Sequence, residues 1–197
     1  MLQHILISYE GKAWPPVQSV FKDAKVLALD TPSKLPRDAV VWFKSQQHHP
    51  LQPQIDLLIK NYQPKRFVVL SNRPNAKEAA YSLSKGARAY TNAHAGPKTI
   101  KQICDVIASG NVWLGQSMMQ NFIKMVNEKK PPPNDHWQDD LTRREVDVAE
   151  LLRQGLSNKL IARQLNITER TVKAHISSLF EKKNVHDRLH LVLELSK

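Results

Sequence analysis

The run LTRREVDVAELLRQGLSNKLIARQLNITERTVKAHISSLFEKK, residues 141–183, decides the fold of the C-terminal part of the chain. Thr142 is of a type that caps helix N-termini and Gly155 of the type that ends helices, so a first helix is predicted between them. Ser157 caps a second, shorter helix. Asn166 stands at a sharp turn that needs a left-handed backbone, which Asn and Gly tolerate. The pattern predicts three short helices in quick succession.

The third helix, ERTVKAHISSLFEKK, has two different faces. Its apolar residues recur at helical spacing within an arc of about 100°: Val172, Ile176, Leu179 and Phe180. The opposite side carries polar or small residues: Arg170, Ala174, Ser177 and Glu181. We expect the apolar face to pack against the other helices and the opposite face to enter a groove of DNA.

Two kinds of DNA contact are expected from these helices. Lys173 can donate to guanine O6 or N7, the Ala174 methyl can touch a thymine methyl, and Ser177 can pair with several bases. Hydroxyls, amides and cations at helix starts and flanks meet phosphate oxygens instead. The residues expected to contact the DNA backbone are Ser157, Asn158, Thr168, Arg170, Thr171 and Lys182.

The N-terminal part alternates strand and helix patterns. Short apolar, β-branched runs predict five buried parallel strands, at residues 4–8, 25–29, 39–43, 66–71 and 87–91. Helical segments are predicted at 17–24, around 55–62, at 76–86 with Gly86 as the end, and at 99–108 and 117–126. This order predicts a flavodoxin-like α/β domain over residues 1–126. A Pro-rich linker at 127–140 and an all-α four-helix domain at 141–197 follow it.

Charge and rare residues narrow the class of protein. Lys and Arg outnumber Asp and Glu by 29 to 18, which favours an anionic partner. The excess lies mainly before residue 137, so the helical motif, not the charge, carries the prediction of DNA binding. No apolar run reaches the roughly 18 residues of a membrane span, and we expect a cytoplasmic protein. Cys104, the single cysteine, is expected to be a buried structural thiol.

The sequence predicts no enzyme, no cofactor and no metal. It contains no P-loop and no G-x-G-x-x-G, and no ligand spacing accompanies His48-His49 or the pair His186 and His190. Two alternatives to a DNA-binding regulator stay open. One is an interaction protein whose basic N-terminal domain binds an acidic partner, and the other is a flavodoxin-like cofactor-binding enzyme.

The helical run resembles the LuxR/FixJ family of helix-turn-helix regulators. The matching positions are Leu141-Thr142, Arg144-Glu145, Gly155 to Lys159, Ile161-Ala162, Leu165, Ile167-Thr168, Thr171 to Lys173 and His175. Asn166 replaces the usual Gly, and Leu160 stands where an acidic residue is common. The resemblance implies that the third helix docks in the major groove and that a fourth, here Asp187 to Ser196, pairs two domains. It thus implies a dimeric transcription regulator on an inverted-repeat operator.

Residues 1–126 resemble the receiver domain of response regulators, most clearly in VVLSNRPNAKEAAYSLSKGARAYTNA and IASGNVWLGQSMMQNFI. Receivers hold Mg²⁺ with an acidic pair and accept a phosphoryl group on an aspartate. The resemblance places the acidic pair on Tyr9 and Glu10, the phosphoacceptor on Phe43, a hydroxyl on Ser71 and a lysine on Ala93. Phenylalanine cannot accept a phosphoryl group, and one glutamate is a poor Mg²⁺ site. We therefore expect a degenerate receiver that aspartyl phosphorylation does not control.

The architecture is also similar to that of the biofilm regulators of the CsgD/VpsT kind. Some of these bind cyclic di-GMP through a Trp, a hydrophobe, Thr/Ser and Arg, where this chain reads Trp113-Leu114-Gly115-Gln116. We expect Trp113 to pack, with cyclic di-GMP as an alternative ligand. Ser71 and Tyr90 match the pair through which receivers couple phosphorylation to dimerisation, or they are a packed serine and tyrosine. A homodimer, a protein contact or a small-molecule effector is the expected means of regulation.

Overall fold

The computed structural model describes residues 2–127 and 135–195, and the chain divides into two compact units, residues 1–114 and 115–197. The sequence predicted the boundary at residue 126, so helix α5 (Gln116–Asn127) belongs to the second unit and not to the first. Within the second unit, α5 contacts α9 (Arg188–Glu194). The α5 backbone also lies against the turn at Gly155. A Cβ added there would come within 3.0 Å of the Cα of Gln120.

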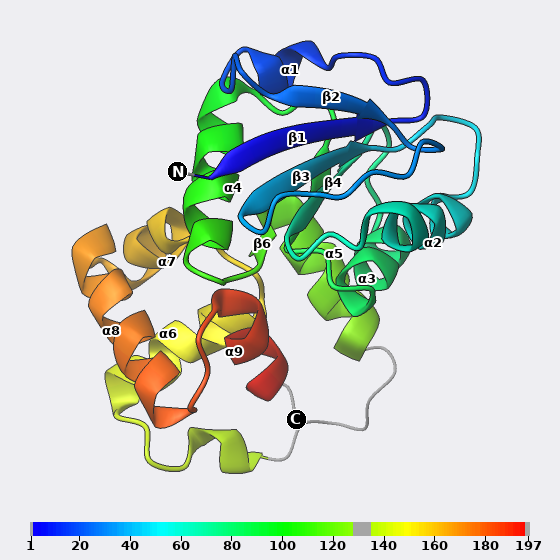
Figure 1. Ribbon diagram of the computed structural model, residues 1–197. Coiled ribbons are helices and arrows are strands. Elements are labelled where there is room, and N and C mark those ends of the chain that lie inside the picture. Colours follow the sequence, from blue (N-terminus) through cyan, green and yellow to red (C-terminus); the bar gives the residue numbers. More distant parts are fainter. Residues whose placement is uncertain (1, 128–134, 196–197) are drawn as a thin grey trace. The chain divides into compact units, whose positions relative to one another are not determined.

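The first unit is built on a sheet of six parallel strands in the order β2-β1-β3-β4-β5-β6 (Figure 1). The strands are β1 (Gln3–Ser8), β2 (Lys25–Ala28), β3 (Ala39–Lys44), β4 (Phe67–Ser71), β5 (Ala89–Asn92) and β6 (Trp113–Leu114). The five predicted strands are confirmed, and β6 is additional. Trp113 pairs with Ala89 and Leu114 with Tyr90, and these two residues are too few to show a period in the sequence.

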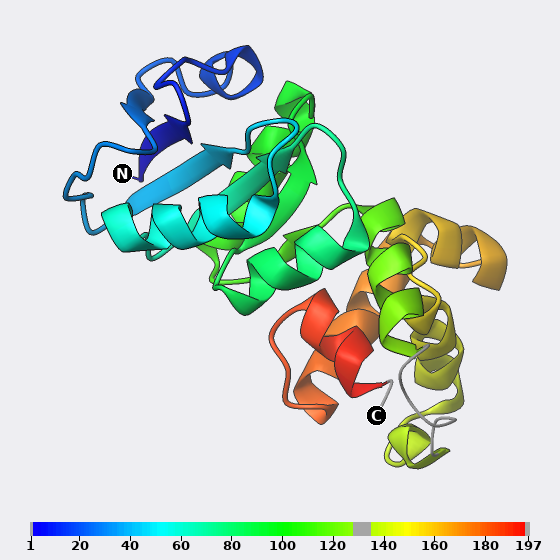
Figure 2. The same ribbon diagram turned by 90° about the vertical axis from the view of Figure 1, so that its right-hand side faces the viewer.

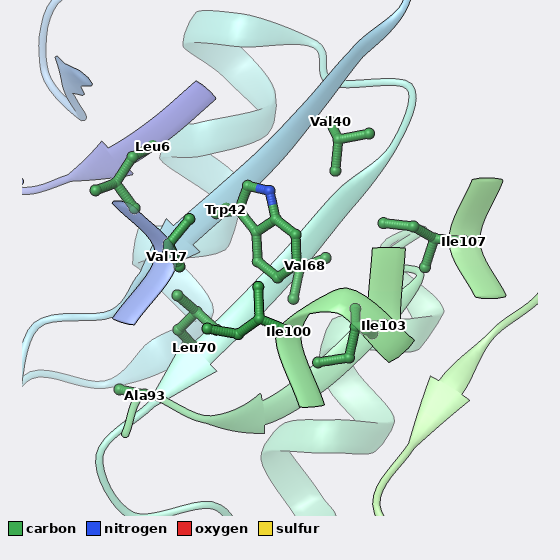
Figure 3. Packing of buried hydrophobic residues seen from close by; sticks show 11 residues of the cluster. Leu6, Val17, Val40, Trp42, Val68, Leu70, Ala93, Ile100, Ile103 and Ile107 are labelled. Atoms are coloured by element: carbon green, nitrogen blue, oxygen red, sulfur yellow. The ribbon is translucent and has the colours of Figure 1, made fainter. Parts of the chain in front are cut away.

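Helices cover both faces of the sheet, which explains why its central strands read as continuous apolar runs. The helices are α1 (Pro15–Gln18), α2 (Leu51–Tyr62), α3 (Ala76–Ser84) and α4 (Pro97–Ala108). Figure 2 shows α2, in cyan, and α3 in front of the sheet. On the other face, Val17 of α1 and Ile103 of α4 pack onto Trp42 and its strand neighbours (Figure 3). Cys104, predicted to be buried, is half-buried beside this cluster.

The connections around β2 are shorter than the sequence pattern predicts. The predicted helix at 17–24 is wrong: only Pro15–Gln18 is helical, and the chain then continues in turns. Val20 and Phe21 have poor helix propensity, and both their amides donate to the Val17 carbonyl. Between β2 and β3, residues 29–38 contain no helix at all (Figure 1).

The second unit is helical and follows the predicted caps closely. Its further helices are α6 (Arg143–Arg153), α7 (Asn158–Leu165), α8 (Glu169–Lys182) and α9. Thr142, Ser157 and Thr168 accept backbone N–H bonds as N-caps of α6, α7 and α8. Asn166 adopts the left-handed conformation, with φ 53° and ψ 47°. The sharp turn between α7 and α8 is therefore confirmed.

The predicted linker at 127–140 is structured at its C-terminal end. Residues 128–134 lie outside the described residues, but Asp135–Gln138 forms a 3₁₀ helix. Trp137 is buried, and the Arg153 guanidinium lies over its ring at 4.8 Å from the centroid. A buried indole with a cationic neighbour outweighs the extended tendency of the prolines. The fully extended linker is thus wrong over residues 135–138.

Glu145 connects α6 to α8 through one buried carboxylate. It forms a capping box with Thr142, whose backbone amide and hydroxyl both donate to Oε2 at 2.7 and 2.8 Å. From α8, Ser178 Oγ donates to Oε1 at 2.6 Å and Lys182 Nζ to Oε2 at 2.8 Å. Burial raises the pKa of Glu145, but the hydrogen bonds from Lys182, Ser178 and Thr142 outweigh this effect and lower the pKa to about 2.

Replacing this carboxylate by an amide removes the interaction without a change of size. A Glu pKa of about 4.3 in the unfolded chain makes the lowered folded pKa equivalent to about 3 kcal/mol, present above pH 4.3 and lost as pH falls from there toward 2. We expect Glu145→Gln to destabilise the helical unit by about 2 to 3 kcal/mol at pH 7, and by progressively less below pH 4.3. Urea unfolding at several pH values measures this.

The exposed Glu181, also on α8, provides the matched control. Glu181→Gln should leave the free energy of unfolding unchanged within about 0.5 kcal/mol at every pH. Equal effects of the two substitutions, or a Glu145→Gln effect that does not shrink in acid, contradict the role of the buried carboxylate.

Candidate functional site

Helix α8 presents the predicted base-reading face to solvent. Lys173, Ala174 and Ser177 are exposed, whereas Val172 and Leu179 are fully buried against the other helices of the unit. Side chains three and four residues apart share a helix face, so the exposed residues form one continuous strip. The two-faced character predicted for this helix is confirmed.

The position of α8 is held at both of its ends. At the N-terminus, Thr168 Oγ1 accepts from the Thr171 amide at 3.1 Å, and the two hydroxyls lie 2.8 Å apart. Near the C-terminus, Ser178 and Lys182 bind Glu145 of α6. The 14 residues of the helix span about 21 Å, and a helix of ordinary diameter fits the major groove, about 12 Å wide.

The residues predicted to contact phosphates do not all offer free polar groups. Thr168 and Arg170 are exposed at the start of α8, and Ser157 is half-exposed at the start of α7. Lys182 instead lies at the far end of α8, where its Nζ donates to Glu145 and to the Asp140 carbonyl at 2.8 Å each. Its position therefore assigns Lys182 a structural contact within the unit.

Asn158 and α9 meet through a residue that the sequence analysis missed. Arg188 Nη1 donates to Asn158 Oδ1 at 3.0 Å, and Nη2 donates to the Leu156 carbonyl. Burial of this guanidinium lowers the pKa of Arg188 to about 10. Arg188 thereby fixes the start of α7. The side-chain oxygen of Asn158, a predicted DNA contact, already accepts this hydrogen bond within the protein.

Two further cations were missed on the exposed side of α7. Lys159 and Arg163 are four residues apart, both exposed, and follow the N-cap Ser157. Together with the exposed Arg170 and Lys173 on α8, these cations of the helix-turn-helix suit a polyanion. The spacing of Lys159 and Arg163 in the sequence was the available signal, because residues four apart share a helix face.

In the first unit, a hollow of about 210 Å³ lies at the carboxyl ends of β1 and β3. This edge is where ligands bind in open parallel sheets, because the strand order reverses there. The hollow is lined by Ser8, Tyr9, Glu10, Lys12, Ala13, Trp14, Lys44, Ser45 and Gln46. Among these residues Glu10 is the single carboxylate.

The chemistry of this hollow does not fit a Mg²⁺ site. Glu10 pairs with Lys12, which lowers the pKa of Glu10, and Lys44 lowers it further. The Lys44 ammonium lies 4.1 Å from the centre of the Trp14 ring. Phe43, which the resemblance placed at the phosphoacceptor position, is fully buried in the core, and Lys44 lines the hollow instead. A hard divalent cation prefers several oxygen ligands, and two ammonium groups oppose it.

Ser71, Tyr90 and Ala93, at the ends of β4 and β5, do not line this hollow, although the Ala93 carbonyl accepts a hydrogen bond from Trp14 Nε1 at 2.6 Å. Tyr90 is fully buried, and its hydroxyl donates to Glu78 Oε2 at 2.7 Å. Ser71 Oγ reaches the same oxygen at 3.4 Å. Burial and this carboxylate raise the pKa of Tyr90. The pair is thus a packed serine and tyrosine held by one carboxylate of α3.

The remaining candidates do not assemble into sites. Trp113 lies in β6 and packs against the hydrophobic cluster of Trp42. His190 binds Asp187, the N-cap of α9, at 2.8 Å, whereas His48 and His49 are exposed. Within residues 2–127 and 135–195, no cluster of His, Cys, Asp and Glu suits a metal ion. In the same residues, no helix has the length and apolar character of a membrane span.

Comparison with known proteins gives the same assignment for the helical unit. Residues 139–195 match the family described as bacterial regulatory proteins, luxR family. This match covers the caps, the turn at Asn166 and all of α6 to α9.

Similarity to individual response regulators extends beyond the helical unit into the first unit. The transcriptional regulatory protein DegU of Brevibacillus brevis is 30% identical over 150 residues, covering 70% of this chain and 64% of that protein. The nitrate/nitrite response regulator protein homolog of Haemophilus influenzae is 39% identical over 116 residues, covering 58% of this chain and 53% of that protein. The chain thus spans between about half and two thirds of the length of these relatives.

Among solved structures, the complex of the two-component response regulator RcsB with DNA has a TM-score of 0.47 and 13% identity, over 100% of this chain and 98% of that chain. At this level the match says nothing of what this chain binds. The relatives show that the chain is similar to response regulators, and its residues 139–195, which follow a receiver-like α/β domain, match the luxR family.

Proposed function

We propose that the protein is a sequence-specific DNA-binding transcription regulator. The observation that carries this proposal is the exposed strip of Lys173, Ala174 and Ser177 on α8, a helix whose opposite face is buried and whose ends are fixed. Donors and a small methyl group on one rigid helix face are what base readout in the major groove requires. The luxR-family match over the same helices supports the assignment.

Phosphate contacts complete the proposed binding mode. Arg170, Lys159 and Arg163 supply exposed cations on both sides of the turn, and Thr168 and Ser157 stand at helix N-termini. Cations that neutralise phosphates give affinity without sequence preference, while Lys173 and its neighbours give specificity. The protein binds an inverted repeat as a homodimer, because two copies related by a two-fold axis place two recognition helices about one DNA turn apart.

The receiver-like domain acts without aspartyl phosphorylation. Its hollow offers two lysines and one paired glutamate where Mg²⁺ and a transferred phosphoryl group need carboxylates. The packing of Trp113 against the hydrophobic cluster argues against a role of this residue in cyclic di-GMP binding. Regulation is therefore left to dimerisation, protein contact or a different ligand.

Substitutions on α8 separate the two kinds of DNA contact. Lys173→Ala should weaken binding to the preferred site by about 1 to 3 kcal/mol and relax the preference at one base position. Arg170→Ala should weaken binding to all sequences alike and reduce the slope of log affinity against log salt by about one. Selection from a random DNA library, followed by anisotropy titrations at several salt concentrations, measures both effects.

Lys60→Ala, on an exposed lysine of α2, is the control and should change neither quantity. A selected site with two-fold symmetry is expected. Failure to enrich any sequence, together with salt-resistant capture of a protein partner, would point to an interaction protein instead. An unchanged base preference in Lys173→Ala would remove that residue from the reading face.

Phosphoryl donors provide a separate test of the receiver-like domain. Incubation with acetyl phosphate and Mg²⁺ should leave the intact mass unchanged and the affinity for the selected DNA unaltered. A reference response regulator with its aspartate in place, treated alongside, should gain one phosphoryl group. A stoichiometric mass increase in this chain would show that another residue accepts phosphate.

A further inference from the structure

A large hollow opens beside the edge strand of the sheet. Residues 29–38 pass from β2 to β3 without a helix, so this corner of the sheet lacks the covering layer that the other crossovers supply. The hollow measures about 850 Å³, within the range of small-molecule sites. Its walls come from β1, β2, the segment after α1 and the segment 33–36.

The lining is apolar and partly accessible. The side chains of Leu2, Val20, Phe21, Leu27 and Leu35 line the hollow, and each is half-buried. Val26 packs against the Trp42 cluster together with Leu2, Val20 and Phe21, so its neighbours Lys25 and Leu27 in β2 point to the other face of the sheet. Burying the half-exposed side chains of Leu27 and Leu35 under a ligand is favourable.

Two features hold this lining in place. The Phe21 ring stacks on His4 with 3.5 Å between ring centroids, and Trp42 Nε1 donates to His4 Nδ1 at 3.1 Å. The segment 33–36 ends in Pro36 and follows Pro32, which restricts its backbone. A site whose walls are already ordered loses less entropy when a ligand binds.

The rim of the hollow is cationic. Lys22, Lys25 and Lys34 line it together with one carboxylate, Asp23, and all four residues are exposed. Among the described residues, none of the three lysines forms an ion pair. Lys34 also lines a neighbouring hollow of about 550 Å³ that contains Arg37 and Lys65 but no carboxylate. The positive rim therefore continues from one hollow to the next.

We infer that this hollow binds an amphipathic organic anion: an apolar aromatic or acyl body with one carboxylate, sulfonate or phosphate head group. The apolar body fits against Leu27 and Leu35, and the head group meets Lys25 and Lys34 at the rim. This ligand site lies in the receiver-like domain and is independent of the DNA-binding assignment of α8. It gives the domain an input other than phosphorylation.

Anilinonaphthalene sulfonate is a suitable probe, because it combines an aromatic body with one sulfonate. Its titration into the full chain without DNA should saturate, and the amide NMR signals that move should be those of β2 and residues 33–36. Lys25→Gln combined with Lys34→Gln should weaken binding by about three- to tenfold. Binding of the uncharged phenylnaphthylamine should hardly change in the same variant.

Two further variants complete the test. Leu35→Asp, in the irregular segment, should abolish binding of both probes, while Lys77→Gln, an exposed lysine of α3, should change neither. The circular dichroism spectrum of each variant should match that of the parent chain, so that loss of binding is not loss of fold. Three results would each overturn the proposal, whatever the DNA experiments show. They are signal changes confined to other parts of the chain, absence of saturable binding, and an affinity for the sulfonate probe that is the same in the double lysine variant as in the parent chain.

Discussion

One buried carboxylate, that of Glu145, sets the arrangement on which the helical unit depends. It accepts hydrogen bonds from Thr142, the N-cap of α6, and from two side chains of α8, so the cap of one helix also fixes the position of another. A buried charge is stable only when its partners are in place, so α8 is held in one orientation. That orientation buries Val172 and Leu179 and leaves Lys173, Ala174 and Ser177 in water.

The receiver-like domain shows how a fold and its chemistry separate. The parallel sheet and its helical layers depend on apolar strands, which this chain has throughout. The hollow at the strand ends depends on a few polar residues, and here Lys12 and Lys44 stand where a phosphorylation site needs acidic groups. The same domain lacks a covering helix after β2, which opens a second hollow with an apolar lining and a cationic rim. The proposed loss of one site and the proposed gain of another require no change in the core.

Features with local causes could be predicted from the sequence, and those with distant causes could not. The caps at Thr142 and Ser157 and the left-handed turn at Asn166 are set by neighbouring residues, and all three are confirmed. The bonds of Glu145 to α8 join residues 33 and 37 apart in sequence, and no local pattern indicates them. The same limit explains why β6 was missed, since its two residues become a strand only by pairing with β5. At β3, the side chain of Phe43 is buried in the core and Lys44 lines the hollow, because successive residues of a strand point to opposite faces.

The central claim is that the exposed strip of α8 lies in the major groove of a specific site. An iron chelate tethered at Glu181→Cys, one turn beyond that strip on the same face of α8, tests it directly in a chain whose single cysteine, Cys104, is replaced by alanine. On the selected DNA, the account predicts cleavage confined to a few nucleotides in each half-site, with the strand offset of cuts made from the major groove. Cuts with the minor-groove offset, or cuts spread evenly along the DNA, would contradict it.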